Sequence, residues 1–366
     1  MTRKIRLGIL FGGRSAEHEV SLQSAKNVIE AVDREKYDLV LITIDKQGQW
    51  HLADPSAFLL NPDDPQRIKL APSEDKLGIV LGDERQLFVR LKNGAPIEAL
   101  DVIFPVLHGP YGEDGTIQGL LKLADVPFVG ASVLGSAVGM DKDVMKRLLR
   151  DGGVPIARSV TLSRNTGEPP GFQELTERLG LPLFIKPANL GSSVGVHKVR
   201  SSEQFESALH DAFQFDGKIL VEEFIEGREI ECSVLGNENP IASVPGEILP
   251  QHEFYSYEAK YIDEKGALLE IPADLPKDVV TSIQNMAVRA YQALCCEGMA
   301  RVDLFLRGHE EIIINEINTI PGFTRISMYP KLWEASGISY GELIDRLVTL
   351  AMERHEREKT LKTSYV

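Results

Sequence analysis

The sequence predicts an α/β protein with additional α+β elements, and two observations lead to this prediction. Residues 6–44 read as strand, helix and strand, because the apolar runs 6–11 and 37–44 flank a helical stripe over residues 20–32. Such a β-α-β unit implies a parallel sheet covered by helices. From residue 141 onward, short apolar strands are separated by Gly-rich turns and by capped or amphipathic helices, which adds α+β elements to the fold.

The other elements follow from apolar periodicity and helix caps. Residues 46–98 are rich in Pro, Asp and Gly, so we expect an irregular insertion there. A chain of 366 residues is too long for one ordinary core, so we expect two or three packed units. The remaining predicted elements are a strand over 101–107, helices over 117–124, 142–149, 201–212 and 279–294, strands over 299–306 and 311–317, and a helix after Ser339.

Composition and charge exclude several classes of function. The net charge of −14 opposes binding to a nucleic-acid backbone, and no basic stripe reverses that sign locally. Apolar runs are of strand length, far short of the roughly 20 residues that a membrane span needs, and the N-terminus lacks a signal peptide. We therefore expect a cytoplasmic protein with no nucleic-acid or membrane partner. Cys232, Cys295 and Cys296 suit neither a disulfide framework nor a zinc site, and we expect buried thiols.

Two predicted strands near the C-terminus carry oxygen-bearing side chains. Arg301 and Asp303 alternate on the first strand, and Glu316 and Asn318 alternate on the second. Alternate residues share one face of a strand, so a hairpin would bring Asp303, Glu316 and Asn318 together. Carboxylate and amide oxygens suit Mg²⁺. The alternative is two exposed strand faces with ordinary salt bridges.

A glycine- and serine-rich turn after a lysine suggests a grip for phosphate. Lys186 ends one predicted strand, and Gly191-Ser-Ser-Val-Gly195 leads to the next. Backbone N–H groups, two hydroxyls and a lysine can bind an anion, and Lys142 at a predicted helix start would add a second cation. The turn could equally be a surface hairpin. It is not a Walker loop, because the lysine precedes the glycines.

The order of these motifs resembles the ATP-grasp superfamily: Lys142, Lys186 with its turn, Val221-Glu-Glu-Phe-Ile225, Arg301-Val-Asp303 and Asn315-Glu-Ile-Asn318. Three further segments are informative: Phe11-Gly-Gly-Arg-Ser-Ala-Glu17-His-Glu-Val-Ser21, His108-Gly-Pro-Tyr-Gly-Glu113-Asp-Gly115 and Asn318-Thr-Ile-Pro-Gly-Phe-Thr324. Together with the longer N-terminal insertion, they closely resemble D-alanine–D-alanine ligases of the A-type, over essentially the whole chain.

The resemblance implies an ATP-grasp fold preceded by an N-terminal Rossmann-like parallel-sheet domain. Residues 1–140 would form this substrate domain, residues 141–231 the central ATP-grasp subdomain, and residues 232–366 the C-terminal subdomain with the metal site and a lid. The implied reaction is ATP-dependent ligation of two D-alanines to D-alanyl-D-alanine through a D-alanyl phosphate, for peptidoglycan precursor synthesis. A homodimer is also implied.

The resemblance assigns residues to ATP and metal. Asp303, Glu316 and Asn318 would hold Mg²⁺ or Mn²⁺, with two ions expected. Phe224 and Ile225 stand where many relatives carry tryptophan and leucine, which leaves their backbone contacts unaffected. The ATP-binding residues would be Lys142, Lys186 and Ser193 for the phosphates, Glu222, Glu223, Phe224 and Ile225 for adenine through backbone contacts, and Glu229 for the ribose.

The resemblance likewise assigns residues to the two amino acids. Residues 253–266 have the polar and aromatic composition of a lid, and its Lys260-Tyr261 pair is similar to D-alanine-specific ligases, whereas D-lactate-specific relatives tend to carry histidine there. For the first D-alanine, the resemblance implies that Glu17 binds the ammonium, that His108 lies near the carboxylate, and that Ser192 and Tyr261 hydrogen-bond with Glu17. Arg301 and the Gly322 backbone would stabilise the oxyanion. For the second D-alanine, Lys260 would contact phosphate and the acceptor carboxylate, and Ser327 with the Met328 backbone would bind that carboxylate.

Three other interpretations stay open. A nucleotide-dependent oxidoreductase is suggested by Gly12-Gly13 in the β-α-β unit, but Gly-x-Gly-x-x-Gly is missing and Glu17 and Glu19 would repel a pyrophosphate. A non-catalytic nucleotide sensor would keep the scaffold without turnover. An ATP-grasp ligase could also use D-lactate or another acceptor.

Overall fold

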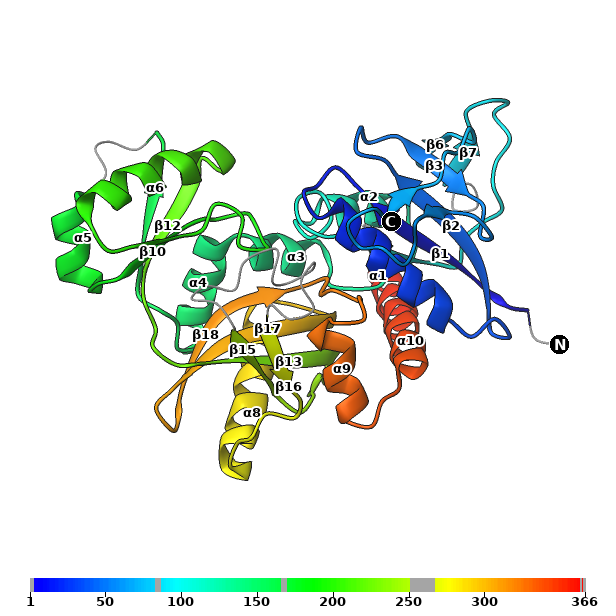
Figure 1. Cartoon of the computed structure of the whole chain (residues 1–366). Helices are drawn as coiled ribbons and strands as arrows, with labels where there is room; N and C mark the ends of the chain where they lie inside the picture. The colour runs from blue at the N-terminus through cyan, green and yellow to red at the C-terminus, as the bar shows by residue number, and fades with distance from the viewer. Residues whose placement is uncertain (1–2, 83–86, 166–169, 251–266, 363, 365–366) are drawn as a thin grey trace.

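The computed structural model describes residues 3–82, 87–165, 170–250, 267–362 and 364, arranged around three main sheets (Figure 1). The first sheet has the order β3-β2-β1-β8. β1 (Ile5–Gly12) pairs in parallel with β2 (Tyr37–Ile44) and with β8 (Val102–Val106), while β3 (Trp50–Ala53) is antiparallel to β2. α1 (His18–Ala31) connects β1 to β2, which confirms the predicted β-α-β unit.

The insertion before β8 is less irregular than predicted, since it contains β3 and two short hairpins. These strands are only two to four residues long, too short for an alternating apolar pattern to be detected in the sequence. The elements are β4 (Leu59–Leu60) with β5 (Lys69–Leu70), and β6 (Leu77–Ile79) with β7 (Phe88–Arg90); after β8 come α2 (Thr116–Leu123), α3 (Val133–Met140) and α4 (Lys142–Asp151).

The middle unit is an antiparallel sheet in the order β11-β10-β12-β9. Its two helices bury Leu175, Phe205 and Leu209 against Ile185 and Val221 of the sheet, so they share one hydrophobic core with it. The elements are β9 (Ser159–Ser163), α5 (Phe172–Leu179), β10 (Leu183–Pro187), β11 (His197–Val199), α6 (Ser202–Phe215) and β12 (Lys218–Glu223).

The third sheet has the order β16-β15-β13-β17-β18, with β14 paired to β13. Its long helix, α8, buries Val279, Ile283 and Ala287 against Val302 and Ile314. The elements are β13 (Arg228–Gly236), β14 (Ile241–Ala242), β15 (Gly246–Pro250), β16 (Ala267–Glu270), α8 (Lys277–Ala293), β17 (Gly298–Arg307), β18 (Glu311–Asn318), α9 (Met328–Ala335) and α10 (Tyr340–Lys359).

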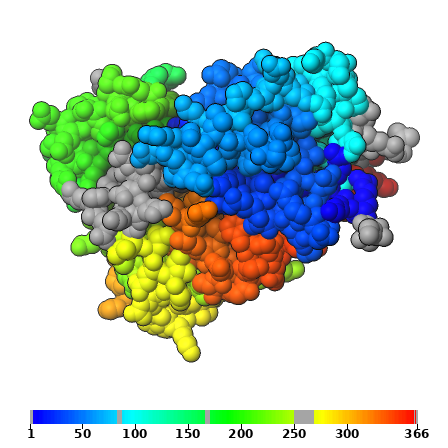
Figure 2. All heavy atoms as spheres, turned by 45° about the vertical axis from the view of Figure 1, so that its right-hand side comes forward, coloured from blue at the N-terminus to red at the C-terminus, as the bar shows by residue number. Residues whose placement is uncertain are grey.

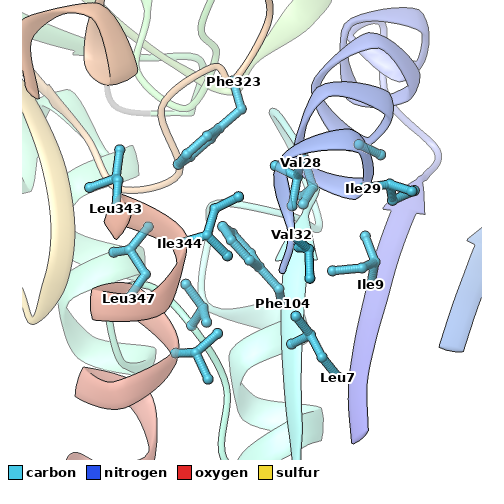
Figure 3. Packing of buried hydrophobic residues seen from close by; sticks show 14 of the residues in the cluster. Leu7, Ile9, Val28, Ile29, Val32, Phe104, Phe323, Leu343, Ile344 and Leu347 are labelled. Carbon is cyan, nitrogen blue, oxygen red and sulfur yellow. The ribbon is translucent and has the colours of Figure 1, made fainter. Parts of the chain in front are cut away.

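The last helix returns to the first sheet. Leu343, Ile344 and Leu347 of α10 pack into one cluster with Phe104 of β8 and Val28 of α1 (Figure 3). N-terminal and C-terminal residues therefore lie directly against each other on the surface, blue against orange and red (Figure 2). The core of the N-terminal unit is completed by the far end of the chain, so the predicted boundary at residue 140 separates sequence segments that share one core.

Arg354 should contribute strongly to this docking. Arg354 is only 3% exposed, and its guanidinium donates to the carbonyls of Gly130 and Phe128 over 2.6 and 2.7 Å and lies 4.5 Å from the Phe128 ring centroid. Arg354→Met leaves two buried carbonyls without donors, so we expect the free energy of unfolding in urea to fall by about 2 to 5 kcal/mol. Arg346→Met, at an exposed position of α10 that pairs with Glu342, should change it by less than about 1 kcal/mol. Equal losses would contradict the assignment.

The expectation of three buried thiols was wrong for one cysteine. Cys232 and Cys296 are buried, but Cys295 is exposed. α8 ends at Ala293, so Cys295 lies in the following turn with a left-handed φ of 53° instead of continuing the helical pattern. Over the described residues, none of the helices is both long and apolar enough to cross a membrane.

Candidate active site

β17 and β18 bring the predicted metal ligands together. The strands are antiparallel, with Asp303 opposite Glu316 and Arg301 opposite Asn318. Asn318 Nδ2 donates to Asp303 Oδ2 over 3.0 Å. This confirms the predicted hairpin and its polar face. In the described part of the chain, no three His, Cys, Asp or Glu side chains form a metal-ligand group, so a metal site here depends on the amide oxygen of Asn318.

Two cations neutralise these carboxylates. Lys142 Nζ lies 3.2 Å from Glu316 Oε2. Arg301 donates from Nε and Nη2 to the two oxygens of Asp303, both over 2.7 Å, and its Nε lies 2.8 Å from Glu231 Oε2. The donor set of two carboxylates and an amide oxygen fits Mg²⁺, which takes few protein oxygens and completes its shell with water and phosphate.

A cavity of about 350 Å³ opens between the middle and C-terminal sheets. It joins the glycine-rich turn, the end of β12, and the β17–β18 pair. These segments lie far apart in the sequence, but the family resemblance assigns all of them to ATP and its metal ion. The predicted residues that line the cavity are Lys142, Lys186, Ser192, Ser193, Glu222, Glu223, Phe224, Ile225, Glu229, Asp303 and Glu316.

A buried carboxylate at the cavity wall is shared by two lysines. Glu222 lies 2.7 Å from Lys186 Nζ and 3.0 Å from Lys146 Nζ. Burial favours the neutral acid, but the two lysines hold the pKa of Glu222 below its usual value. Lys186 Nζ also reaches Asn315 Oδ1 over 3.4 Å. Lys146 was missed by sequence reasoning, although it lies one helical turn after Lys142 on α4.

The adenine edge expected at the end of β12 lies on the cavity wall and includes an aromatic pair. The rings of Phe224 and Phe184 stack with centroids 6.0 Å apart, and Lys198 Nζ lies 4.6 Å from the Phe224 centroid. Glu223 accepts from the backbone N and Nε of Arg158, both over 2.7 Å. Its carboxylate is thus occupied, which fits the prediction that residue 223 acts through its backbone.

A hydrogen-bonded pair of polar side chains lies where the glycine-rich turn meets the N-terminal unit. Ser192 donates a hydrogen bond to the buried carboxylate of Glu17. Ser192 and Ser193 both have left-handed backbone, with φ of 54° and 60°, a conformation that non-glycine residues adopt at a small energetic cost. Burial, followed by the charge of Glu17, raises the pKa of Glu113 to about 8. Glu113 therefore keeps its proton at neutral pH, which avoids a second negative charge beside Glu17.

The loop from Thr319 to Ser327 places Gly322 beside the start of α9. A Cβ on Gly322 would lie 2.6 Å from Ser327 Oγ, so a larger residue would require this hydroxyl to move. Ser327 Oγ accepts from Thr324 N over 3.0 Å and lies 2.8 Å from Thr324 Oγ1. Met328 is buried against Ile248, which leaves its backbone for the predicted role. Lys260 and Tyr261 lie outside the described residues.

His108 is buried and both of its ring nitrogens have protein partners. Nδ1 lies 3.1 Å from the carbonyl oxygen of Ile320, and Nε2 lies 3.0 Å from Ser24 Oγ. Ser24 was missed because its partners lie 84 and 299 residues away in sequence. Burial, aided by the charge of Arg301, lowers the pKa of His108 to about 4.

This low pKa predicts acid lability. The unfolded chain binds a proton below the ordinary histidine pKa of 6.5, whereas the folded His108 resists protonation down to about 4. Its stabilising contribution is therefore complete above pH 6.5 and is lost as the pH falls toward 4. Between pH 7 and 4, the free energy of unfolding should fall by about 3 kcal/mol more in the native protein than in His108→Asn.

Equilibrium unfolding across that pH range measures the difference. The opposite pH dependence that Glu113 contributes is present in both proteins and cancels to first order. His309→Asn, at an exposed position of the β17–β18 turn, should keep the native pH dependence. Parallel curves for the native protein and His108→Asn would show that His108 is not the group that titrates.

Comparisons with known proteins agree over nearly the whole chain. The family models described as D-ala D-ala ligase N-terminus and D-ala D-ala ligase C-terminus match residues 6–131 and 148–349. The chain is 59% identical over 361 residues to the D-alanine--D-alanine ligase of Oceanobacillus iheyensis, covering 99% of each chain.

Solved structures show the same likeness. The D-alanine-D-alanine ligase from Coxiella burnetii superposes with a TM-score of 0.85 at 41% identity, covering 98% of this chain and 96% of that one. VanG D-Ala:D-Ser ligase from Enterococcus faecalis superposes with a TM-score of 0.84 at 36% identity, covering 95% and 100%.

Proposed function

Because the chain belongs to the D-alanine–D-alanine ligase family, we propose that it joins two D-alanine molecules into D-alanyl-D-alanine at the expense of ATP. The product would serve peptidoglycan precursor synthesis. The observation that carries the proposal is the cavity in which Lys142, Lys186, Asp303 and Glu316 meet. Two cations and two carboxylates around one space suit a polyphosphate with a divalent ion.

The cavity would bind ATP with its phosphates between the two lysines. Lys142 is held at the turn by donating to the carbonyl of Leu190 over 2.7 Å, and its backbone N donates to Ala188 O over 3.0 Å. Asp303, Glu316 and Asn318 would hold Mg²⁺ or Mn²⁺. A bound divalent ion would neutralise charge on the phosphates. Glu229, also at the cavity wall, would face the ribose.

The first step would activate a carboxylate. Glu17, oriented by Ser192, would bind the ammonium of the first D-alanine beside the cavity. A carboxylate oxygen of this D-alanine would attack the γ-phosphorus, forming an O–P bond and an acyl phosphate while the bond to ADP breaks. Phosphorylation is needed because a free carboxylate is a poor electrophile toward an amine.

The second step would form the peptide bond. The amine of the second D-alanine, its carboxylate near Ser327 and the Met328 backbone, would attack the acyl carbon, and inorganic phosphate and a proton would leave. Negative charge develops on the former carbonyl oxygen. Arg301 and the Gly322 N–H would stabilise it, each donor contributing roughly 2.7 to 4 kcal/mol in comparable sites.

The proposed lid residues complete this scheme by family resemblance alone. Lys260 would contact phosphate and the acceptor carboxylate, and Tyr261 would join Ser192 and Glu17. We also propose that the protein is a cytoplasmic homodimer, which sedimentation analysis of the purified protein would test.

ADP release with ATP and Mg²⁺ tests the function, with product masses measured in parallel. Release with D-alanine and the mass of the dipeptide is expected. Reactions with D-alanine plus D-serine or D-lactate address the acceptor, since the similar VanG protein is named a D-Ala:D-Ser ligase. Release only with L-alanine would overturn the substrate, and no release at all would favour a nucleotide sensor.

A further inference from the structure

The segment Ile320–Phe323 is held on both sides of Gly322 by side chains of the N-terminal unit. The carbonyl of Ile320 faces His108 Nδ1 over 3.1 Å. Phe323 N donates to Ser24 Oγ over 3.2 Å, and Phe323 O accepts from Asn27 Nδ2 over 2.9 Å. The N-terminal unit therefore fixes this stretch of backbone at both ends.

The hydrogen bonds around His108 have one consistent proton arrangement. A carbonyl oxygen can only accept, so Nδ1 carries the proton and donates to Ile320. In the neutral ring, Nε2 is then an acceptor, so the hydroxyl of Ser24 must donate to it. Ser24 Oγ keeps lone pairs for the Phe323 N–H. Ser24 thus links the imidazole to the far side of Gly322, while the Ile320 carbonyl fixes the ring tautomer.

This arrangement changes the expected role of His108. Its two nitrogens face Ile320 and Ser24 rather than open space, and the residue is 4% exposed. Within the described residues, the Gly322 N–H meets no acceptor. The fixed backbone therefore presents one unengaged donor between two anchored residues.

We propose that Ser24 is a positioning residue for the ligation step, which acts through His108 and the Phe323 amide to hold the Gly322 N–H toward the oxyanion. The proposal rests on the proposed ligase function. It also makes His108 a positioning residue, not a direct ligand of the substrate carboxylate. A donor held in place before the reaction lowers the barrier because no reorganisation is needed as charge develops.

Ser24→Ala removes the hydroxyl and no other group. We expect kcat for dipeptide formation to fall about three- to tenfold, the effect of one neutral hydrogen bond. KM for ATP should change less than about twofold, because the cavity lies elsewhere. In ¹⁵N spectra of the imidazole, Nδ1 of His108 should stay protonated while the Nε2 resonance shifts. Ser24→Cys, with a weaker donor, should give an intermediate kcat.

Ser21→Ala is the matched control. Ser21 is also fully buried on α1, but its hydroxyl binds Gly12 N and Val106 O, away from the segment. It should lower Tm while leaving kcat and the His108 resonances close to native. An unchanged kcat in Ser24→Ala, or equal losses of kcat in both variants, would overturn the proposal. A native protein without ligase activity would instead refute the proposed function.

Discussion

Glu316→Gln is expected to lower kcat by about a hundred- to a thousandfold at any practical Mg²⁺ concentration, with the fold intact. The carboxylate lies opposite Asp303 and 3.2 Å from Lys142. Glutamine keeps the shape but removes the charge, so the proposed divalent ion would lose one of its two anionic ligands, and stabilisation of the transferring phosphoryl charge would fall by several kcal/mol. Single-turnover ADP release measures the loss.

The control for this variant lies on the same strand. Glu311→Gln changes an exposed carboxylate at the start of β18 that pairs with Arg307, and kcat should stay within about twofold of native. Circular dichroism and Tm would establish that Glu316→Gln is folded. A near-native rate for the folded variant would remove Glu316 from the mechanism.

Arg301→Lys is expected to lower kcat about a hundredfold, although the positive charge is retained. The guanidinium binds both oxygens of Asp303 and also contacts Glu231. A lysine ammonium cannot form this planar fork, so it would lose the orientation toward the oxyanion. KM for ATP should change only a few-fold.

Arg307→Lys tests whether any arginine-to-lysine substitution on β17 would lower kcat. Arg307 also binds a carboxylate with two nitrogens, that of Glu311, but at the exposed end of the strand. Its kcat should be native. If Arg301→Lys raised KM for ATP and left kcat unchanged, Arg301 would belong to ATP binding and not to oxyanion stabilisation.

The sequence predicted those parts of the site whose residues are close in the chain or alternate along one strand. Asp303, Glu316 and Asn318 alternate on two adjacent strands, so a period of two and one hairpin were enough to bring them together. Lys186 could be predicted in the same way, because the glycine-rich turn begins five residues after it, at Gly191. In each case the information lies within about 20 residues of chain.

The parts that sequence missed depend on long-range pairing. Ser24 has no motif of its own, and its relation to Phe323 exists only once α1 lies against the loop before α9. Lys146 resembles any helical lysine until Glu222 is found 3.0 Å away. Cys295 shows the opposite error: a buried thiol was expected, but the residue lies exposed in the turn after α8.

The packing of α10 has a consequence for synthesis on the ribosome. β1 and β8 are complete by Val106, yet the helix that covers their core begins at Tyr340. At about 5–20 residues per second, roughly 10 to 50 s separate the two events. During that interval the nascent N-terminal sheet exposes apolar surface, so truncated chains that end before Tyr340 should depend on chaperones in a way that the full-length protein does not.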